Sequence, residues 1–276
     1  MRKIWLGAVA VLAFCLPAQA ADAPAATTIV LASTTSVDNS GLLAAILPEF
    51  TKATGISVKV LALGTGQALD TARRGDADIV LVHDPEAEQK FLADGNGVNQ
   101  RQIAWNDFIL VGPKDDPAHV EGGHNTKAAL TGIADAEAPF VSRGDRSGTN
   151  ALELRLWKGA GIDPKAGAGR WYRDIGGGMG AALNAAAAMP AYTLSDRGTW
   201  LSFKNKGPLR IMVEGDPALV NRYDVIELNP KTHANAKLAP AHQLAMWLTT
   251  QPGQNAIGAY QLDGEVLFHP SAADPK

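Results

Sequence analysis

Strand-like and helix-like segments alternate along the first third of the sequence, and this alternation restricts the possible folds more than any other feature. The apolar run TTIVLAS is followed by an amphipathic stretch that ends at Gly55, and the runs ISVKVLALG and ADIVLVHD then repeat the strand pattern with a short helix between them. This order is typical of a parallel sheet covered by helices. The sequence therefore predicts an α/β protein.

Two later strand-like segments divide the predicted fold into lobes. We interpret Phe108 to Val111 and Tyr223 to Leu228 as paired crossings between two α/β lobes. The first lobe then contains residues 27–110 and 224–276, and the second contains residues 111–223. Ligands of open α/β sheets bind beyond the carboxyl ends of the strands. A cleft between the lobes would collect several of these ends.

The first twenty residues have the features of a secretory signal peptide. Arg2 and Lys3 precede an uncharged apolar run, and small residues lead to an expected cleavage after Ala20. The protein is therefore expected in the periplasm. The single cysteine of the chain, Cys15, would leave with residues 1–20. Neither disulfides nor cysteine-based metal sites are then expected in the mature protein.

Charge and composition argue against two kinds of partner. The chain has 25 basic and 28 acidic residues, a net charge of −3, which is unlike the basic surface that binds nucleic acid. Hydrophobic residues make up 46% of the sequence, but no later apolar run is as long as a membrane span. We expect a soluble monomer that does not bind nucleic acid.

Three loop-to-helix junctions share a composition that suits an anion. They are STTSVDNSG from Ser33, GTGQ from Gly64 and SRGDRSGT from Ser142, and each combines hydroxyl side chains with glycine. Hydroxyls and backbone amides at the positive end of a helix dipole are hydrogen-bond donors. Taken singly, such residues are also ordinary helix caps and turn residues. Together they predict a cage of donors around an oxyanion.

Arginine adds the formal charge that hydroxyls lack. Its planar guanidinium can donate to two oxygens of one anion. Arg143 directly follows a predicted strand and is the expected ligand, whereas Arg146 is expected to be solvated or paired with Asp145. The candidate oxyanion ligands are Thr34, Thr35, Ser36, Thr65, Arg143, Ser147 and Thr149.

Other motifs predict less. The glycine-rich GGGMGA matches a dinucleotide pattern, but no strong strand precedes it, and we interpret it as a fourth junction with the amides of Gly178 and Met179 facing the cleft. The six histidines lack the paired spacing of metal ligands, so neither a metal nor a cofactor is expected. Tyr192 is expected in the core, and a contact with the anion is the alternative.

Five segments resemble the periplasmic tungstate-binding proteins of ABC transporters across nearly the whole mature chain. These segments are STTSVDNSGLL, GTGQALDTARRGDADIVLVHDPEAEQKF, NDFILVGPKDDPA, SRGDRSGT and AYTLSDRGTW. The resemblance implies a type II periplasmic binding protein, whose two α/β lobes close on a tetrahedral oxyanion. It also implies delivery of tungstate, or of the closely similar molybdate, to an ABC permease in the inner membrane. No reaction is catalysed on this interpretation.

The resemblance also assigns the motifs by position. The family's Thr-Thr-Thr-Ser loop falls on residues 33–36, its Gly-Thr-Gly turn on residues 64–66, and its arginine on Arg143, with Thr149 nearby. Ser33 departs from the usual threonine but still offers a hydroxyl. Whether Ser33 contacts the anion stays open.

Two alternative functions remain open on the sequence. The pattern R-x-x-x-S-G-T also resembles the anion loop of periplasmic phosphate receptors, in which Asp145 could accept the ligand's own proton. A secreted hydrolase of phosphate or sulfate esters would need a nucleophile beside a base. The candidate serines and threonines have no histidine near them in the sequence. A fully deprotonated dianion accepts hydrogen bonds only, which favours the donor-rich cage of a tungstate receptor.

Overall fold

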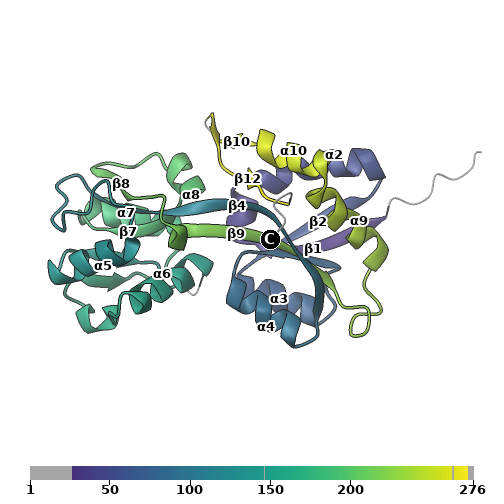
Figure 1. Cartoon of the computed structure of the whole chain (residues 1–276), viewed down its shortest axis with the longest axis horizontal. Coiled ribbons are helices and arrows are strands. Elements are labelled where there is room, and N and C mark those ends of the chain that lie inside the picture. The colour runs from purple at the N-terminus through teal and green to yellow at the C-terminus, as the bar shows by residue number, and fades with distance from the viewer. Residues whose placement is uncertain (1–26, 146, 263, 273–276) are drawn as a thin grey trace, which may run out of the picture.

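Two α/β lobes joined by two long strands make up the protein in a computed structural model that describes residues 27–145, 147–262 and 264–272 (Figure 1). The joining strands are β4 (Gly97–Pro113) and β9 (Val220–Leu228), which pair with each other in antiparallel register. The predicted two-lobed α/β fold with two crossing strands is confirmed. The predicted signal peptide, residues 1–20, lies outside the described residues.

The first lobe, lobe I, is built on a sheet that contains three parallel strands and also includes the crossing strands. Its sheet has the order β12-β4-β9-β3-β1-β2, in which β1 is parallel to β2 and β3. Helices cover both faces (Figure 1). The elements are β1 (Thr28–Thr34), α1 (Thr35–Asn39), α2 (Leu42–Thr54), β2 (Ser57–Leu63), α3 (Thr65–Arg73), β3 (Ile79–Val82), α4 (Pro85–Ala93), α9 (Leu238–Thr249), α10 (Gln251–Ala259), β10 (Gln261–Leu262), β11 (Glu265–Val266) and β12 (His269–Pro270).

The second lobe, lobe II, is built on the far half of β4. There β4 pairs with β7 and β8, and β5 lies between β6 and β7. The elements are α5 (Thr126–Asp135), β5 (Phe140–Ser142), α6 (Gly148–Gly159), the 3₁₀ helix η1 (Pro164–Gly167), β6 (Tyr172–Asp174), α7 (Met179–Ala188), β7 (Thr193–Asp196), α8 (Arg197–Ser202), β8 (Leu209–Val213) and the 3₁₀ helix η2 (Pro217–Leu219).

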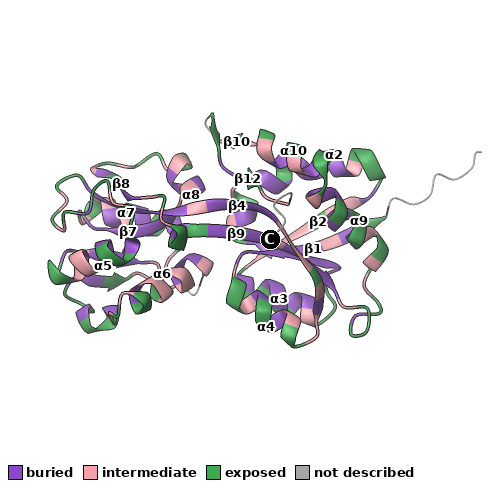
Figure 2. Cartoon of the chain, in the orientation of Figure 1, coloured by how far each residue is buried: buried purple, intermediate pink, exposed green. Residues whose placement is uncertain are grey.

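Strand alternation explains why each sheet is covered on both faces. In β1, Ile29 and Leu31 pack under α2, α9 and α10, whereas Ala32 packs with α3 and α4 on the other face. In β4, Phe108 packs with α5 and α6, and Ile109 packs with α7 and α8. Successive side chains of a strand point to opposite faces, so these apolar runs have two faces to bury. Figure 2 shows the central strands buried and the outer helix faces exposed.

The crossing strand β4 changes partner where the lobes meet. Asp107 pairs with Val220 of β9, and the next residue, Phe108, pairs with Asp196 of β7. The two segments that the sequence interpretation named as crossings lie in β4 and β9 but not opposite each other. Phe108 to Val111 pair with β7, and Tyr223 to Leu228 pair with residues 97–104 of β4. Hydrophobic periodicity identifies strands but does not give the register between strands far apart in the chain. The predicted lobe limits stay a prediction.

Helix length bears on the membrane question. Among the described residues, every helix is too short or too polar to cross a bilayer. The longest of them, α2, has 13 residues, whereas a span needs about 20.

Candidate functional site

The first half of the candidate site is a cluster of hydroxyls in lobe I, where β1 runs directly into α1. Thr34 caps α1, and its Oγ1 accepts a bond from the Val37 amide at 3.3 Å. Ser36 Oγ lies 3.0 Å from Thr34 Oγ1. Both hydroxyls reach Nε2 of His83, at 3.0 Å from Ser36 and 3.1 Å from Thr34. We call Thr34, Ser36 and His83 the hydroxyl cluster.

Sequence reasoning missed His83, which is the first residue after β3. The ring is buried, and its Nδ1 lies 3.1 Å from Oδ1 of Asn221 in β9. Burial lowers the pKa of His83 from its usual value, although the bond to Asn221 and the charges of Asp196 and Asp84 oppose this shift. A position at the carboxyl end of a buried strand was the available signal, because ligands of such sheets bind there.

Polar side chains of the crossing strands fix Asn221 in turn. Asn221 Nδ2 donates to Asn106 Oδ1 at 2.9 Å and to the Tyr223 hydroxyl at 2.6 Å. The Tyr223 hydroxyl donates to Asn106 Oδ1 at 3.1 Å. All three residues are buried. Since the amide nitrogen is occupied on this side, the carbonyl oxygen of Asn221 is the atom that faces His83.

The N-terminus of α6 in lobe II approaches the lobe I half of the site. A Cβ on Gly148 would lie 3.2 Å from His83 Cε1 and 3.8 Å from Thr65 Oγ1. Thr65 is nearly buried at the start of α3, whose N-cap Gly64 has no side chain with which to cap the helix amides. A residue larger than glycine at position 148 would press on lobe I. The predicted junctions therefore meet across the lobes.

The second half of the site is the arginine loop of lobe II, residues 142–149. Nε and Nη2 of Arg143 both donate to Asp145 Oδ2, Nε at 3.1 Å, and Nη1 lies 3.4 Å from Thr149 Oγ1. The Arg143 side chain is only 13% exposed. The other oxygen of Asp145, Oδ1, accepts a bond from the Ser147 amide at 3.1 Å.

Asp145 is held ionised by these bonds. Partial burial acts to raise the pKa of its carboxyl, but the bonds from Ser147 and Arg143 outweigh burial and hold the pKa below the usual value. The sequence interpretation offered Asp145 as a partner for Arg146, and the structure pairs it with Arg143. Arg143 and Asp145 are two positions apart in the sequence and bond to each other within one loop. The sequence interpretation did not consider this pairing. Arg146 lies outside the described residues.

A buried network fixes the arginine loop to α6. Ser147 caps the helix, and its Oγ accepts a bond from the Asn150 amide at 3.3 Å. Asn150 Nδ2 donates to Ser142 Oγ at 3.2 Å, and Ser142 donates to Glu153 Oε2 at 2.7 Å. Burial raises the pKa of Glu153 to about 7, although bonds from its neighbours act against the shift. The loop is thus anchored at both ends.

Gly144 allows the tight turn between Arg143 and Asp145. It has a φ of 62°, and a Cβ there would lie 1.4 Å from Asp174 Oδ1. Only glycine fits both the backbone and the space. The carbonyl of Arg143 accepts a bond from the Gly177 amide at 2.9 Å, which places the glycine-rich junction before α7 beside the loop. At that junction Met179 is buried and Gly178 offers no side-chain cap.

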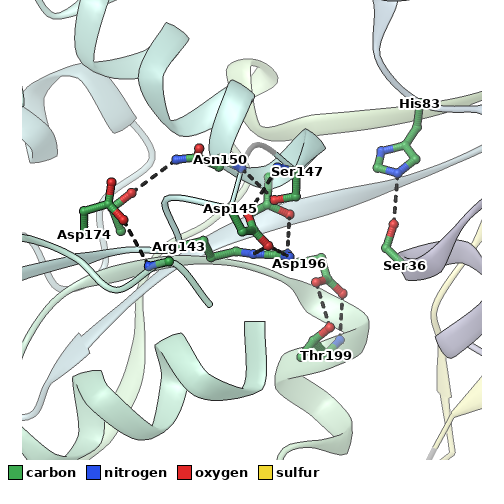
Figure 3. A network of polar contacts seen from close by, with 12 residues as sticks. Ser36, His83, Arg143, Asp145, Ser147, Asn150, Asp174, Asp196 and Thr199 are labelled. Carbon is green, nitrogen blue, oxygen red and sulfur yellow. Dashed lines mark hydrogen bonds and ion pairs between the residues drawn. The ribbon is translucent and has the colours of Figure 1, made fainter. Parts of the chain in front are cut away.

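The predicted ligands therefore gather in two groups. Figure 3 shows Arg143, Asp145 and Ser147 together on one side of the site and Ser36 with His83 on the other. Thr35, by contrast, is exposed on the first turn of α1. For Ser33 and Tyr192 the sequence left a contact with the anion open, and in the structure both hydroxyls bond other groups. Ser33 Oγ donates to the Leu81 carbonyl within the sheet, and the Tyr192 hydroxyl donates to Asp116 Oδ1 at 2.7 Å.

Two cavities lie near the crossing strands. The smaller, of about 280 Å³, lies between the lobes and is lined by His83, Phe108, Gly148, Arg155 and Asn221, among others. The larger, of about 910 Å³, is lined by residues of the crossing strands such as Trp105 and Arg222. The smaller one adjoins the hydroxyl cluster and is the better match to the candidate site.

The sequence matches proteins whose ligand is known. A family model described as a PBP superfamily domain matches residues 18–250. The tungstate-binding protein TupA of Peptoclostridium acidaminophilum is 45% identical over 249 residues, which cover 89% of this chain and 86% of that protein. The chain belongs to the family of tungstate-binding proteins.

Solved structures agree with this family. The tungstate-binding protein TupA of Desulfovibrio alaskensis G20 has 42% identity and a TM-score of 0.82, covering 89% of this chain and 99% of that chain. The structure of the tungstate ABC transporter from Geobacter sulfurreducens has 43% identity and a TM-score of 0.74, covering 84% of this chain and 98% of that chain. The resemblance noted in the sequence is confirmed, and so is the binding-protein fold that it implied.

Proposed function

We propose that this protein is the receptor of an ABC transporter that captures tungstate between its lobes and delivers it to a membrane permease. The observation that carries the proposal is the meeting of two helix N-termini, at Thr65 and Gly148, beside the hydroxyl cluster. We infer that hydroxyls from lobe I and the guanidinium of lobe II would contact one ligand held between them. The protein is a binding protein and not an enzyme.

The donor groups suit an acceptor-only dianion. Thr34, Ser36 and Thr65 offer hydroxyls from lobe I, and Arg143, Ser147 and Thr149 offer donors from lobe II. Helix N-termini add backbone amides and a positive dipole, which favour a bound anion. A tetrahedral oxyanion held between the lobes would link these donors. The exposed Thr35 would join them only by movement of the first turn of α1.

The charge of Arg143 would be redirected on binding. In the structure both donors of its fork are engaged by Asp145. A guanidinium has five N–H groups, so Arg143 can keep part of this pairing and turn the rest toward the ligand. Thr149 Oγ1 lies 3.4 Å from Nη1, the guanidinium nitrogen that Asp145 does not engage.

Phosphate is the less suitable ligand. A phosphate receptor needs an acceptor for the ligand's proton, and Asp145 was the candidate. Both oxygens of Asp145 already accept bonds, from Arg143 and from the Ser147 amide, so a phosphate hydroxyl would have to share an engaged oxygen, whereas fully deprotonated tungstate needs no acceptor. Molybdate, by contrast, has nearly the same size and charge as tungstate and fits the same donors.

The hydrogen bonds among Ser36, His83 and Asn221 resemble those of a hydrolase triad, but two features distinguish them from one. Ser36 Oγ lies 3.0 Å from His83 Nε2, and His83 Nδ1 lies 3.1 Å from Asn221 Oδ1. In a triad with a serine nucleophile a carboxylate stabilises the imidazolium that forms during the reaction, whereas Asn221 is uncharged. Nε2 is also shared with Thr34. The cluster therefore organises hydroxyls, consistent with a binding protein.

The predicted signal peptide indicates the cellular location. We propose that residues 1–20 direct the chain to the periplasm and are removed there. A receptor in that compartment would meet both the free oxyanion and the outer face of a permease in the inner membrane.

Titration calorimetry with tungstate, molybdate, sulfate and phosphate tests the proposal. Tungstate and molybdate should bind, and tungstate should raise the melting temperature, because a ligand at a thousandfold excess over its Kd stabilises the folded state by about 4 kcal/mol. Binding of phosphate without binding of tungstate or molybdate would instead establish a phosphate receptor.

A further inference from the structure

His83 lies at the point where the hydrogen bonds of the lobe I half converge. Its Nε2, Ser36 Oγ and Thr34 Oγ1 form a triangle with sides of 3.0, 3.1 and 3.0 Å. Thr34 Oγ1 also accepts the bond from the Val37 amide. The number of hydroxyls that can donate to a ligand depends on which of these three atoms carry protons and where those protons point.

The tautomer of the neutral ring follows from Asn221. The amide nitrogen of Asn221 donates to Asn106 and Tyr223, so its carbonyl oxygen faces His83 Nδ1. A carbonyl oxygen only accepts. Nδ1 therefore carries the proton, and Nε2 of the neutral ring is a bare acceptor between two hydroxyls.

A dianion in the cleft competes with His83 Nε2 for the two hydroxyl protons. With a neutral ring, one of the two hydroxyls must spend its proton on Nε2, which leaves at most one for the ligand. With a protonated ring, Nε2–H donates to the hydroxyl oxygens, and both hydroxyl protons are free. Protonation thus adds one donor and one positive charge to the lobe I half.

Burial and the neighbouring charged groups act on the protonation of His83 in opposite directions. Burial disfavours the charged ring, and Asp84 and Asp196 favour it. The ring of Tyr223 packs 5.0 Å away, the N-terminus of α6 faces it from lobe II, and Arg155 and Arg222 line the same cavity. A dianion adds two negative charges within the contact distance of the hydroxyls.

We propose that His83 takes up a proton when the oxyanion binds and thereby turns the hydroxyls of Thr34 and Ser36 toward the ligand. His83 is then a positioning residue, because it acts through the hydroxyls. The inference rests on the proposed function, since only an acceptor-only anion in the cleft demands both hydroxyl protons.

Proton uptake by His83 fixes the direction in which tungstate affinity depends on pH. Binding raises the affinity of His83 for a proton, so a lower pH favours the bound state. Affinity should fall as pH rises from the pKa of the free form, which lies below its usual value, to the pKa of the bound form. The limiting slope is about tenfold per pH unit for one proton.

Calorimetry in buffers of different ionisation enthalpy measures the proton directly. Tungstate is titrated into the full-length mature protein from about pH 6 to about pH 9, where the anion stays fully deprotonated and histidine changes charge. We expect an uptake approaching one proton per tungstate. Tungstate binding without uptake at any pH would overturn the inference and leave the receptor function standing. Failure of both tungstate and molybdate to bind would overturn the function itself.

Variants separate His83 from Glu153, a buried carboxyl group whose pKa burial raises to about 7. His83→Gln places an amide near Nε2 that can donate without titrating, so it should bind more tightly than His83→Asn and lose the uptake. His83→Asn lacks that amide and should bind at least about fivefold more weakly, again without uptake. His242→Asn is the matched control, because His242 lies on α9 and bonds Glu227. Uptake that persists in both His83 variants would overturn the inference.

Discussion

The two halves of the site satisfy their polar groups in different ways. In lobe I, Thr34 and Ser36 are neutral donors whose protons are shared with the ring of His83. In lobe II, Arg143 is a charged donor whose fork is neutralised by Asp145. In this arrangement the hydroxyls of Thr34 and Ser36 and the fork of Arg143 are engaged in internal hydrogen bonds. The ligand must therefore displace internal hydrogen bonds on both sides, and an anion with fewer acceptor oxygens would recover fewer of them.

Removing the charge of lobe II should have the largest effect. Arg143→Ala is expected to weaken tungstate binding about thirtyfold, because hydrogen bonds to charged groups contribute roughly 1.5–3 kcal/mol and Asp145 would be left uncompensated beside the dianion. Arg143→Lys should recover only part, since an ammonium lacks the fork. Calorimetry measures both. Arg210→Ala, at a surface pair with Glu121, is the control. An Arg143→Ala protein that binds like the wild type would remove lobe II from the site.

Removing the internal competitor of Arg143 should act in the opposite direction. Asp145→Asn keeps the shape but deletes a negative charge close to the dianion, so we expect binding about tenfold tighter at low ionic strength. Asp163→Asn, at an exposed cap of η1, should change nothing. If Asp145→Asn instead weakens binding, then the main role of Asp145 is to orient Arg143, and the two halves are less different than we describe.

A single hydroxyl of lobe I should matter less than either charge. Ser36→Ala is expected to weaken tungstate binding about fivefold, in line with roughly 0.5–1.5 kcal/mol for one hydrogen bond. Thr131→Ala is the control, because that hydroxyl bonds the Lys127 carbonyl within α5. A loss as large as that of Arg143→Ala would show that neutral donors and charge contribute equally.

A buried carboxyl group of lobe I should affect stability and not binding. Burial, together with the charge of Asp224, raises the pKa of Glu88 in α4 to about 9. Ionising it therefore costs the folded state stability as pH rises from about 4.5 toward 9. Glu88→Gln should flatten this dependence and raise the melting temperature at pH 8 by a few degrees. Glu49→Gln, at an exposed position, should not. A lower melting temperature for Glu88→Gln at pH 8 would contradict this.

Local features of the sequence were enough to predict the strands, the two crossings and the three junctions. Apolar runs and loop composition depend on neighbouring residues, and they predicted strand-to-helix junctions at Thr34, Thr65 and Arg143, where the structure has them. His83 and Asn221 escaped notice because their contact joins residues 138 apart and depends on the pairing of β3 with β9. The pairing of Arg143 with Asp145 was missed for another reason. It depends on the turn at Gly144, whose left-handed backbone a composition argument does not specify.

The central claim is that one oxyanion bridges both lobes, and tungsten itself can report its position. A crystal of the protein grown with tungstate and measured near a tungsten absorption edge would give an anomalous peak at the metal. The account predicts one strong peak between the guanidinium of Arg143 and the hydroxyls of Ser36 and Thr65. A peak confined to the larger cavity beside Trp105, with nothing between the lobes, would contradict it.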